Sequence, residues 1–338
     1  MQYRPTVSIV TVPECAEQAK RVHALLHLAG HDVRDGVVLV NTKTFADGNA
    51  RPKVMATIRR TEVYLFYTMP LREPEKGMAR LAQILNAIHL ADPISARVVM
   101  AYFEGRQDRK DEERTPMTAK VTARVIEGEK SVRGFITFDL HADQLMLAFD
   151  NPVENLWGQL LLARYARTLF QPDRKVGVIA PDVGSAKRAE KFAAKSGFPL
   201  MGIIEKKRGG ANTVEMMRYI GDPIDGYDII LPDDLIDTAG TIVKANDLLL
   251  SKGALTTTAF ATHWLASPKG DPSDPLYTAE AKLRNAKVRV VATTTIPRVA
   301  DYMLANGDLI TFVPCEEMIA STIGESLTPG GSVSKLGE

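Results

Sequence analysis

Two adjacent acids and a turn of small residues separate an apolar run from a helical pattern in the second half of the chain. Asp233 and Asp234 follow the run 229–231, and the turn 237–241 leads into a pattern that ends near Gly253. This order predicts a strand, a loop and a helix, with the loop at the carboxyl end of the strand, where open α/β sheets bind ligands. Backbone N–H groups at the start of a helix suit a phosphate, and two carboxylates suit sugar hydroxyls or a metal ion. We therefore expect a ribose-phosphate site.

A turn that only caps the helix is the simpler explanation of the same residues. Asp237 or Thr238 would then accept a hydrogen bond from the first turn of the helix. Capping does not require Asp233 and Asp234 as well, and one set of residues can serve both as a cap and as a phosphate site.

A second loop, residues 180–188, also follows a strand pattern and opens a helix. Asp182 at the end of that strand could hold a cation directly or through water, and Gly184 would let a ligand approach the backbone closely. Lys187 and Arg188 either contribute to such a site or are solvated charges on the helix.

Three further charged segments admit both a functional and a structural interpretation. His141 lies between two acids after a predicted strand, which favours an ion or proton role over that of a satisfied polar residue. The segment 104–114 is either a solvated loop or a polyphosphate site, because guanidinium groups such as those of Arg106 and Arg109 match phosphate oxygens. The segment 205–211 is either an exposed turn or a basic lid that closes over phosphate.

Composition narrows the class of protein that carries these segments. The chain has 338 residues, of which 45% are hydrophobic and 25% charged, as in soluble globular proteins of two domains. Its formal net charge of +1 favours neither nucleic acid nor a membrane as a partner. Cys15 and Cys315 have no metal-like spacing and fit a reducing cytoplasm. We recognise neither a signal peptide nor an apolar run long enough to cross a membrane.

Apolar runs alternate with helical patterns along the chain, which predicts an α/β fold of mainly parallel sheets covered by helices. The expected strands are 7–12, 37–40, 53–58, 63–67, 97–102, 134–140, 176–180, 200–204, 229–231, 256–262, 288–291 and 309–312. The expected helices are 16–28, 77–90, 117–127, 156–170, 185–196 and the one after residue 241. We place one domain at 1–150 and a second at 151–310, and we expect a helix and tail at 311–338 to pack back on the first domain.

Taken together, these motifs resemble those of the ribose-phosphate pyrophosphokinase (phosphoribosyl pyrophosphate synthetase) family. The similarity extends from about Phe45 to Gly324. The matching segments, in the order found in the family, are 106–110 with 115–120, 139–144, 181–188, 204–208, 233–241, 261–263 and 293–297. Several motifs in one order are more specific than any one of them, because the loop 233–241 alone would also fit a phosphoribosyltransferase.

The resemblance implies two related phosphoribosyltransferase-like domains that transfer the diphosphate of Mg-ATP to the C1 hydroxyl of ribose 5-phosphate. It implies that the first domain carries the ATP side, that the second carries the ribose 5-phosphate side, and that the chain forms a homo-oligomer, commonly a hexamer built from dimers. The implied residues are Phe45, Asp47, Arg106 and Gln107 for ATP; Asp233, Asp234, Asp237, Thr238, Ala239, Gly240 and Thr241 for ribose 5-phosphate; His141 and Asp182 for Mg²⁺; and Lys206 and Arg208 for catalysis.

Several positions depart from the family pattern. Asn49 stands where the family has an acid, Glu104 where it has an aromatic residue, Lys207 where it has Arg, and Thr294 where it has an acid or an amide. These changes concern nucleotide contacts more than the ribose-phosphate loop. They leave open a catalytically weak regulatory paralogue that assembles with active subunits, and a phosphoribosyltransferase is the other alternative.

Overall fold

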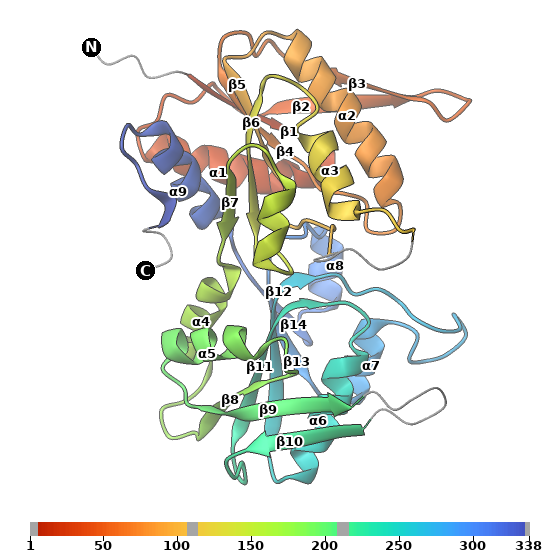
Figure 1. Cartoon of the computed structure of the whole chain (residues 1–338), viewed down its shortest axis with the longest axis vertical. Helices are drawn as coiled ribbons and strands as arrows, with labels where there is room; N and C mark the ends of the chain where they lie inside the picture. The colour runs from red at the N-terminus through yellow and green to blue at the C-terminus, as the bar shows by residue number, and fades with distance from the viewer. Residues whose placement is uncertain (1–5, 107–113, 208–215, 335–338) are drawn as a thin grey trace. The chain divides into compact units, whose positions relative to one another are not determined.

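Two seven-stranded sheets, each flanked by helices, form the framework of the chain (Figure 1). The computed structural model describes residues 6–106, 114–207 and 216–334. The chain divides into two compact units, of which unit 1 comprises Met1–Leu156 and Cys315–Glu338 and unit 2 comprises Trp157–Pro314. The predicted α/β class is confirmed, because in each sheet the strand pairs are parallel except for one antiparallel pair at an edge.

Unit 1 is built on a sheet with the strand order β3-β2-β1-β4-β5-β6-β7. Its elements are β1 (Val7–Thr11), η1 (Pro13–Cys15), α1 (Ala16–Leu28), β2 (Val38–Thr44), β3 (Ala50–Val54), β4 (Glu62–Phe66), α2 (Pro74–Leu90), β5 (Ser95–Val99), α3 (Thr118–Ile126), β6 (Val132–Phe138), η2 (Asp143–Ala148), β7 (Val153–Leu156) and α9 (Glu316–Leu327). Strand β1, in the interior of the sheet, is buried along its whole length, as expected of a parallel strand that is covered on both faces.

The last helix, α9, packs against the first, α1. Gly324 of α9 lies close to the residues that follow α1, because a Cβ added at Gly324 would lie 2.8 Å from Nε2 of His31. Gln18 donates a hydrogen bond to the buried Cys315 Sγ across the same contact, at 3.6 Å. Cys315 and helix α9 are therefore part of the core of unit 1.

Unit 2 is built on a sheet with the strand order β10-β9-β8-β11-β12-β13-β14. Its elements are α4 (Gly158–Leu169), β8 (Val176–Ala180), α5 (Ala186–Ser196), β9 (Leu200–Lys207), β10 (Met216–Gly221), β11 (Asp228–Ile236), α6 (Gly240–Ser251), β12 (Thr256–Trp264), α7 (Ala279–Asn285), β13 (Arg289–Thr293), α8 (Ala300–Ala305) and β14 (Ile310–Val313). None of the helices in the described part of the chain is long and apolar enough to cross a membrane.

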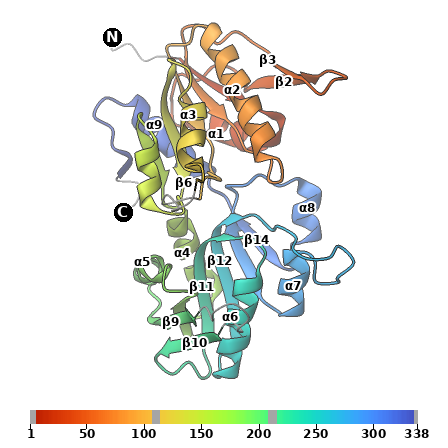
Figure 2. The same ribbon diagram turned by 45° about the vertical axis from the view of Figure 1, so that its right-hand side comes forward.

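The sheet of unit 2 separates two apolar clusters, because successive side chains of a strand point to opposite faces. Ile229 and Leu231 of β11 join α6 and α7 in one cluster, whereas Ile230 joins α4 and α5 in the other. In the second cluster Phe192 packs edge-on against Phe260, with 5.4 Å between the ring centroids. Figures 1 and 2 show these helix pairs beside the sheet. This packing holds β11 and β12 at the centre of the unit, and both strands end beside the predicted site.

Candidate functional site

The loop 237–241 joins the end of β11 to the start of α6. The N-cap residue of α6 is Ala239, whose φ of 61° lies in the left-handed region. The N-cap position is therefore one residue after Thr238, and alanine has no side-chain oxygen that could cap the helix. A Cβ built at Gly240 would meet only Thr238 Oγ1, at 4.0 Å, which leaves open space beside the first turn. The first N–H groups of a helix have no partner within the helix, so this turn can bind an anion.

The paired acids at the end of β11 are held by an arginine from α5. Nη1 of Arg188 lies 3.1 Å from Oδ1 of Asp233 and 3.6 Å from Oδ1 of Asp234. The backbone N–H of Asp234 also donates to Oδ1 of Asp233, at 2.9 Å. Burial and the neighbouring Asp234 raise the pKa of Asp233 well above its usual value, while Arg188 lowers it. The guanidinium therefore keeps two closely spaced carboxylates in place at the loop.

Asp182 and Lys206 form a second pair in unit 2. Nζ of Lys206, on β9, lies 3.4 Å from Oδ2 of Asp182, which follows β8. Oδ1 of Asp182 accepts a hydrogen bond from the backbone N–H of Ser185 at 2.9 Å, so its carboxylate has a defined orientation. Its side chain is 37% exposed and can reach a ligand. Arg208, the other predicted catalytic cation, lies outside the described residues.

The predicted nucleotide side lies in unit 1. Phe45 and Asp47 are in the turn between β2 and β3, and Nζ of Lys43 lies 5.2 Å from the centroid of the Phe45 ring. Asn49 donates to Asp47 through its backbone N–H at 3.0 Å and its amide at 2.8 Å, which lowers the pKa of the Asp47 carboxyl. Both the backbone and the side-chain amide of Asn49 are therefore bonded to Asp47.

Arg106 and His141 follow neighbouring strands of the same sheet. Arg106 comes after β5 and His141 after β6, and both are exposed. Gln107 lies outside the described residues. Both carboxylate oxygens of Glu104, two positions before Arg106, are buried without a hydrogen-bond partner among the described residues, and this burial raises the pKa of Glu104 to about 7.

Two polar residues support the acid pair, and the sequence indicated only one of them. Arg188 was visible as a cation in the loop 180–188, but its partners were not. The buried Gln159 of α4 donates through Nε2 to the carbonyl oxygen of Asp233 at 2.5 Å and to Oγ1 of Thr262 at 3.1 Å. No local pattern marks Gln159, because its partners come from strands β11 and β12.

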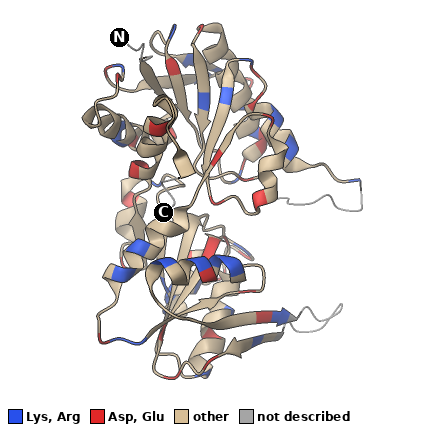
Figure 3. Ribbon diagram, turned by 60° about the vertical axis from the view of Figure 1, so that its left-hand side comes forward, with Lys and Arg blue, Asp and Glu red and all other residues tan. Residues whose placement is uncertain are grey.

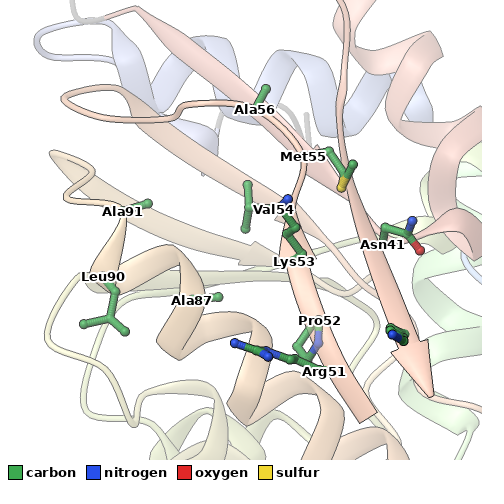
Figure 4. A pocket seen from close by; sticks show the side chains of 11 residues that line it. Asn41, Arg51, Pro52, Lys53, Val54, Met55, Ala56, Ala87, Leu90 and Ala91 are labelled. Carbon is green, nitrogen blue, oxygen red and sulfur yellow. The ribbon is translucent and has the colours of Figure 1, made fainter. Parts of the chain in front are cut away.

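A cavity of about 860 Å³ lies elsewhere, on unit 1 (Figure 4). It is lined by residues of β2 and β3 and by the end of α2, including Lys43, Arg51, Lys53 and Leu90. None of the predicted site residues that the structure describes lines it, so this cavity is separate from the predicted site.

Basic and acidic residues are both present on each unit (Figure 3). Within the described residues no group of three or more His, Cys, Asp or Glu side chains is placed to hold a metal ion by itself. The exposed carboxylate of Asp182 nevertheless fits Mg²⁺, which prefers oxygen ligands, takes few from the protein and keeps several waters.

The two sheets and the strand, acid pair, loop and helix at the carboxyl end of β11 place the chain among two-domain α/β proteins of the phosphoribosyltransferase type. The family model for the N-terminal domain of ribose phosphate pyrophosphokinase matches residues 7–129. A ribose-phosphate pyrophosphokinase of Helicobacter hepaticus is 37% identical over 259 residues, which are 76% of this chain and 79% of the relative. That of Aquifex aeolicus is 34% identical over 87% of this chain and 89% of its own length.

The crystal structure of phosphoribosylpyrophosphate synthetase from Mycobacterium smegmatis superposes with a TM-score of 0.80 at 26% identity, covering 95% of this chain and 98% of that one. The likeness therefore includes both units. The chain belongs to the ribose-phosphate pyrophosphokinase family.

Proposed function

We propose that this chain transfers the diphosphate of Mg-ATP to the C1 hydroxyl of ribose 5-phosphate, which gives 5-phosphoribosyl 1-pyrophosphate and AMP. The observation that carries the proposal lies in unit 2. There the acid pair near the end of β11 is followed by the first turn of α6, whose backbone N–H groups can bind a phosphate. The names of the relatives support the same reaction.

The sugar would bind with its 5-phosphate at the loop 237–241 and its hydroxyls at the acid pair. Backbone N–H groups at the start of α6 and the hydroxyls of Thr238 and Thr241 donate to phosphate oxygens. Asp233 and Asp234 accept from ribose hydroxyls, and Arg188 limits the repulsion between the acids and the phosphate. The reacting C1 hydroxyl is thereby held by contacts to both ends of the sugar.

The diphosphate transfer forms a bond between the C1 oxygen and the β-phosphorus of ATP. The bond from that phosphorus to the oxygen that bridges to the α-phosphate breaks, AMP leaves, and the hydroxyl loses its proton. Negative charge on the phosphoryl oxygens must be stabilised throughout. Lys206 and Arg208 would supply positive charge there, which makes them the catalytic cations in this proposal. The same cations would help to hold ATP in line.

On the nucleotide side, Arg106 and Gln107 would contact ATP, and Phe45 and Asp47 would contact the adenine of a neighbouring subunit. This last assignment requires a homo-oligomer, which we propose together with it. His141 and Asp182 would hold Mg²⁺, which neutralises phosphate charge when bound. A cytoplasmic location stays a prediction.

The direct test combines the purified chain with ATP, Mg²⁺ and ribose 5-phosphate and measures AMP and 5-phosphoribosyl 1-pyrophosphate. We expect equal amounts of both products and none when ribose 5-phosphate is omitted. A background level of AMP would refute the proposal and support the regulatory paralogue. Consumption of 5-phosphoribosyl 1-pyrophosphate with a nucleobase, without ATP, would support the phosphoribosyltransferase.

A further inference from the structure

The segment that follows β12 is bonded to the last residue of β11 and to the first residue of the loop 237–241. The backbone N–H of Leu265 donates to the carbonyl oxygen of Ile236 at 3.0 Å, and that of Ser267 donates to the carbonyl oxygen of Asp237 at 3.1 Å. The base of the long loop after β12 therefore fixes the first residue of the predicted phosphate loop.

Arg298, between β13 and α8, donates hydrogen bonds to the same segment. Its Nη2 donates to the carbonyl oxygens of Trp264 at 2.7 Å and Leu265 at 2.8 Å. Its guanidinium carbon lies 4.9 Å from the centroid of the Tyr302 ring. Tyr302 in turn accepts from Nε1 of Trp264 at 2.7 Å and donates to Glu280 at 2.5 Å. The end of β12 is thus held by a network that involves α7 and α8.

The held segment and the phosphate loop each contain a strained residue. Ala266 has a φ of 56° and Ala239 a φ of 61°, and left-handed backbone is unfavourable for alanine. Such conformations persist where surrounding contacts determine them, and they are found at sites that bind ligands. Lys282 of α7 adds a contact, because its Nζ lies 3.4 Å from the carbonyl oxygen of Thr238.

We propose that Arg298 is a positioning residue for the phosphate of the sugar substrate. It holds residues 264–267 against the loop 237–241, so that the N–H groups at the start of α6 are already arranged for an anion before the substrate binds. This inference rests on the proposed function, because that function assigns the sugar phosphate to the loop. Arg298 acts through backbone groups and is not assigned a contact with the substrate.

The test compares Arg298→Lys, which keeps the charge but loses the planar guanidinium, with Arg284→Lys. Arg284 is a matched control, because Nη2 of its guanidinium also holds a carbonyl oxygen, that of Ala305 at 3.3 Å, and the group pairs with Asp308. In the part of the chain that the structure describes, the hydrogen bonds of Arg284 go to Ala305, Asn306 and Asp308 and not to the loop 237–241. We expect Arg298→Lys to raise the KM for ribose 5-phosphate about tenfold and the KM for ATP less than about twofold, whereas Arg284→Lys changes neither.

Direct binding of ribose 5-phosphate, measured by calorimetry on the full chain, separates this inference from the proposed function. If the wild-type chain binds the sugar phosphate but forms no AMP, the proposed function fails. The inference about Arg298 can still be tested, because it predicts that Arg298→Lys binds ribose 5-phosphate about tenfold more weakly than the wild type. Equal binding by wild type and Arg298→Lys would overturn the inference.

A second variant keeps more of the network, so that a result is still obtained if Arg298→Lys fails to fold. Tyr302→Phe retains the ring beneath Arg298 but removes the hydroxyl between Trp264 and Glu280. We expect it to fold and to weaken binding of ribose 5-phosphate about threefold. A loss of thermal stability in both variants without any change in sugar-phosphate affinity would assign Arg298 a purely structural role and refute the proposal.

Discussion

Replacing Arg188 by Ala should destabilise unit 2 in a pH-dependent manner. Breaking a buried ion pair from one side costs about 3–5 kcal/mol, because the remaining charge is left without a partner. The side chains of Arg188 and Asp233 are 20% and 19% exposed, so water relieves part of that cost. We therefore expect about 2 kcal/mol at pH 7.5, which corresponds to a fall in Tm of roughly 4–8 °C for a unit of this size.

The pH dependence follows from the raised pKa of Asp233. A carboxyl whose pKa is higher in the folded than in the unfolded state binds its proton more tightly when folded, so stability falls as pH rises through the interval between the two pKa values. Arg188 opposes that rise, and its removal raises the pKa of Asp233 further. The loss of stability in Arg188→Ala should consequently be larger at pH 7.5 than at pH 5.

Thermal unfolding followed by calorimetry at both pH values measures this difference. The control is the double variant Arg188→Ala with Asp233→Asn, in which one of the two carboxylates has been removed and much of the lost stability should return. An equal loss at pH 5 and pH 7.5, or no recovery in the double variant, would show that the guanidinium does not serve to compensate the acid pair.

Three further predictions concern other parts of the site. Replacing Lys206 and Arg208 by Ala together should abolish turnover with little change in Tm, and activity that persists would disprove their role as catalytic cations. Gly240→Ala should change Tm by less than about 1 °C from that of the wild type, because the added Cβ meets open space. The same variant should raise the KM for ribose 5-phosphate at least about fivefold, and an unchanged KM would place the phosphate elsewhere. Glu104→Gln should stabilise the protein by about 2 kcal/mol at pH 8.5 and by little at pH 5. The reason is that the wild-type carboxyl, with a pKa of about 7, must ionise in a buried place as pH rises. Equal urea-unfolding midpoints of wild type and variant at pH 8.5 would contradict this.

Local periodicity was sufficient to predict the long elements. The helix expected at 16–28 is α1 with the same limits, and the strand expected at 176–180 is β8. Each buries a regular set of apolar side chains, so the pattern is contained in the segment itself. The short helices α7 and α8 were not predicted, because six or seven residues do not show a period.

Two of the edge strands, β7 and β10, were not predicted from the sequence. The residues of β7 (VENL) and of β10 (MMRYIG) mix polar and apolar types without an extended buried run. They are strands because β6 and β9 offer an unpaired edge to them. Whether such a segment pairs depends on what lies beside it, which a local pattern does not contain.

The sequence by itself determined the class of the fold, the order of its central elements and the motifs that identify the family, since all of these are properties of short contiguous segments. Only the tertiary structure decided what holds the site. Arg188 meets Asp233 across 45 positions, Lys206 meets Asp182 across 24, and Arg298 reaches Trp264 across 34. These contacts depend on how helices pack on the sheet and on the register of parallel strands. Both are set by burial of the whole core and not by the residues that make the contact.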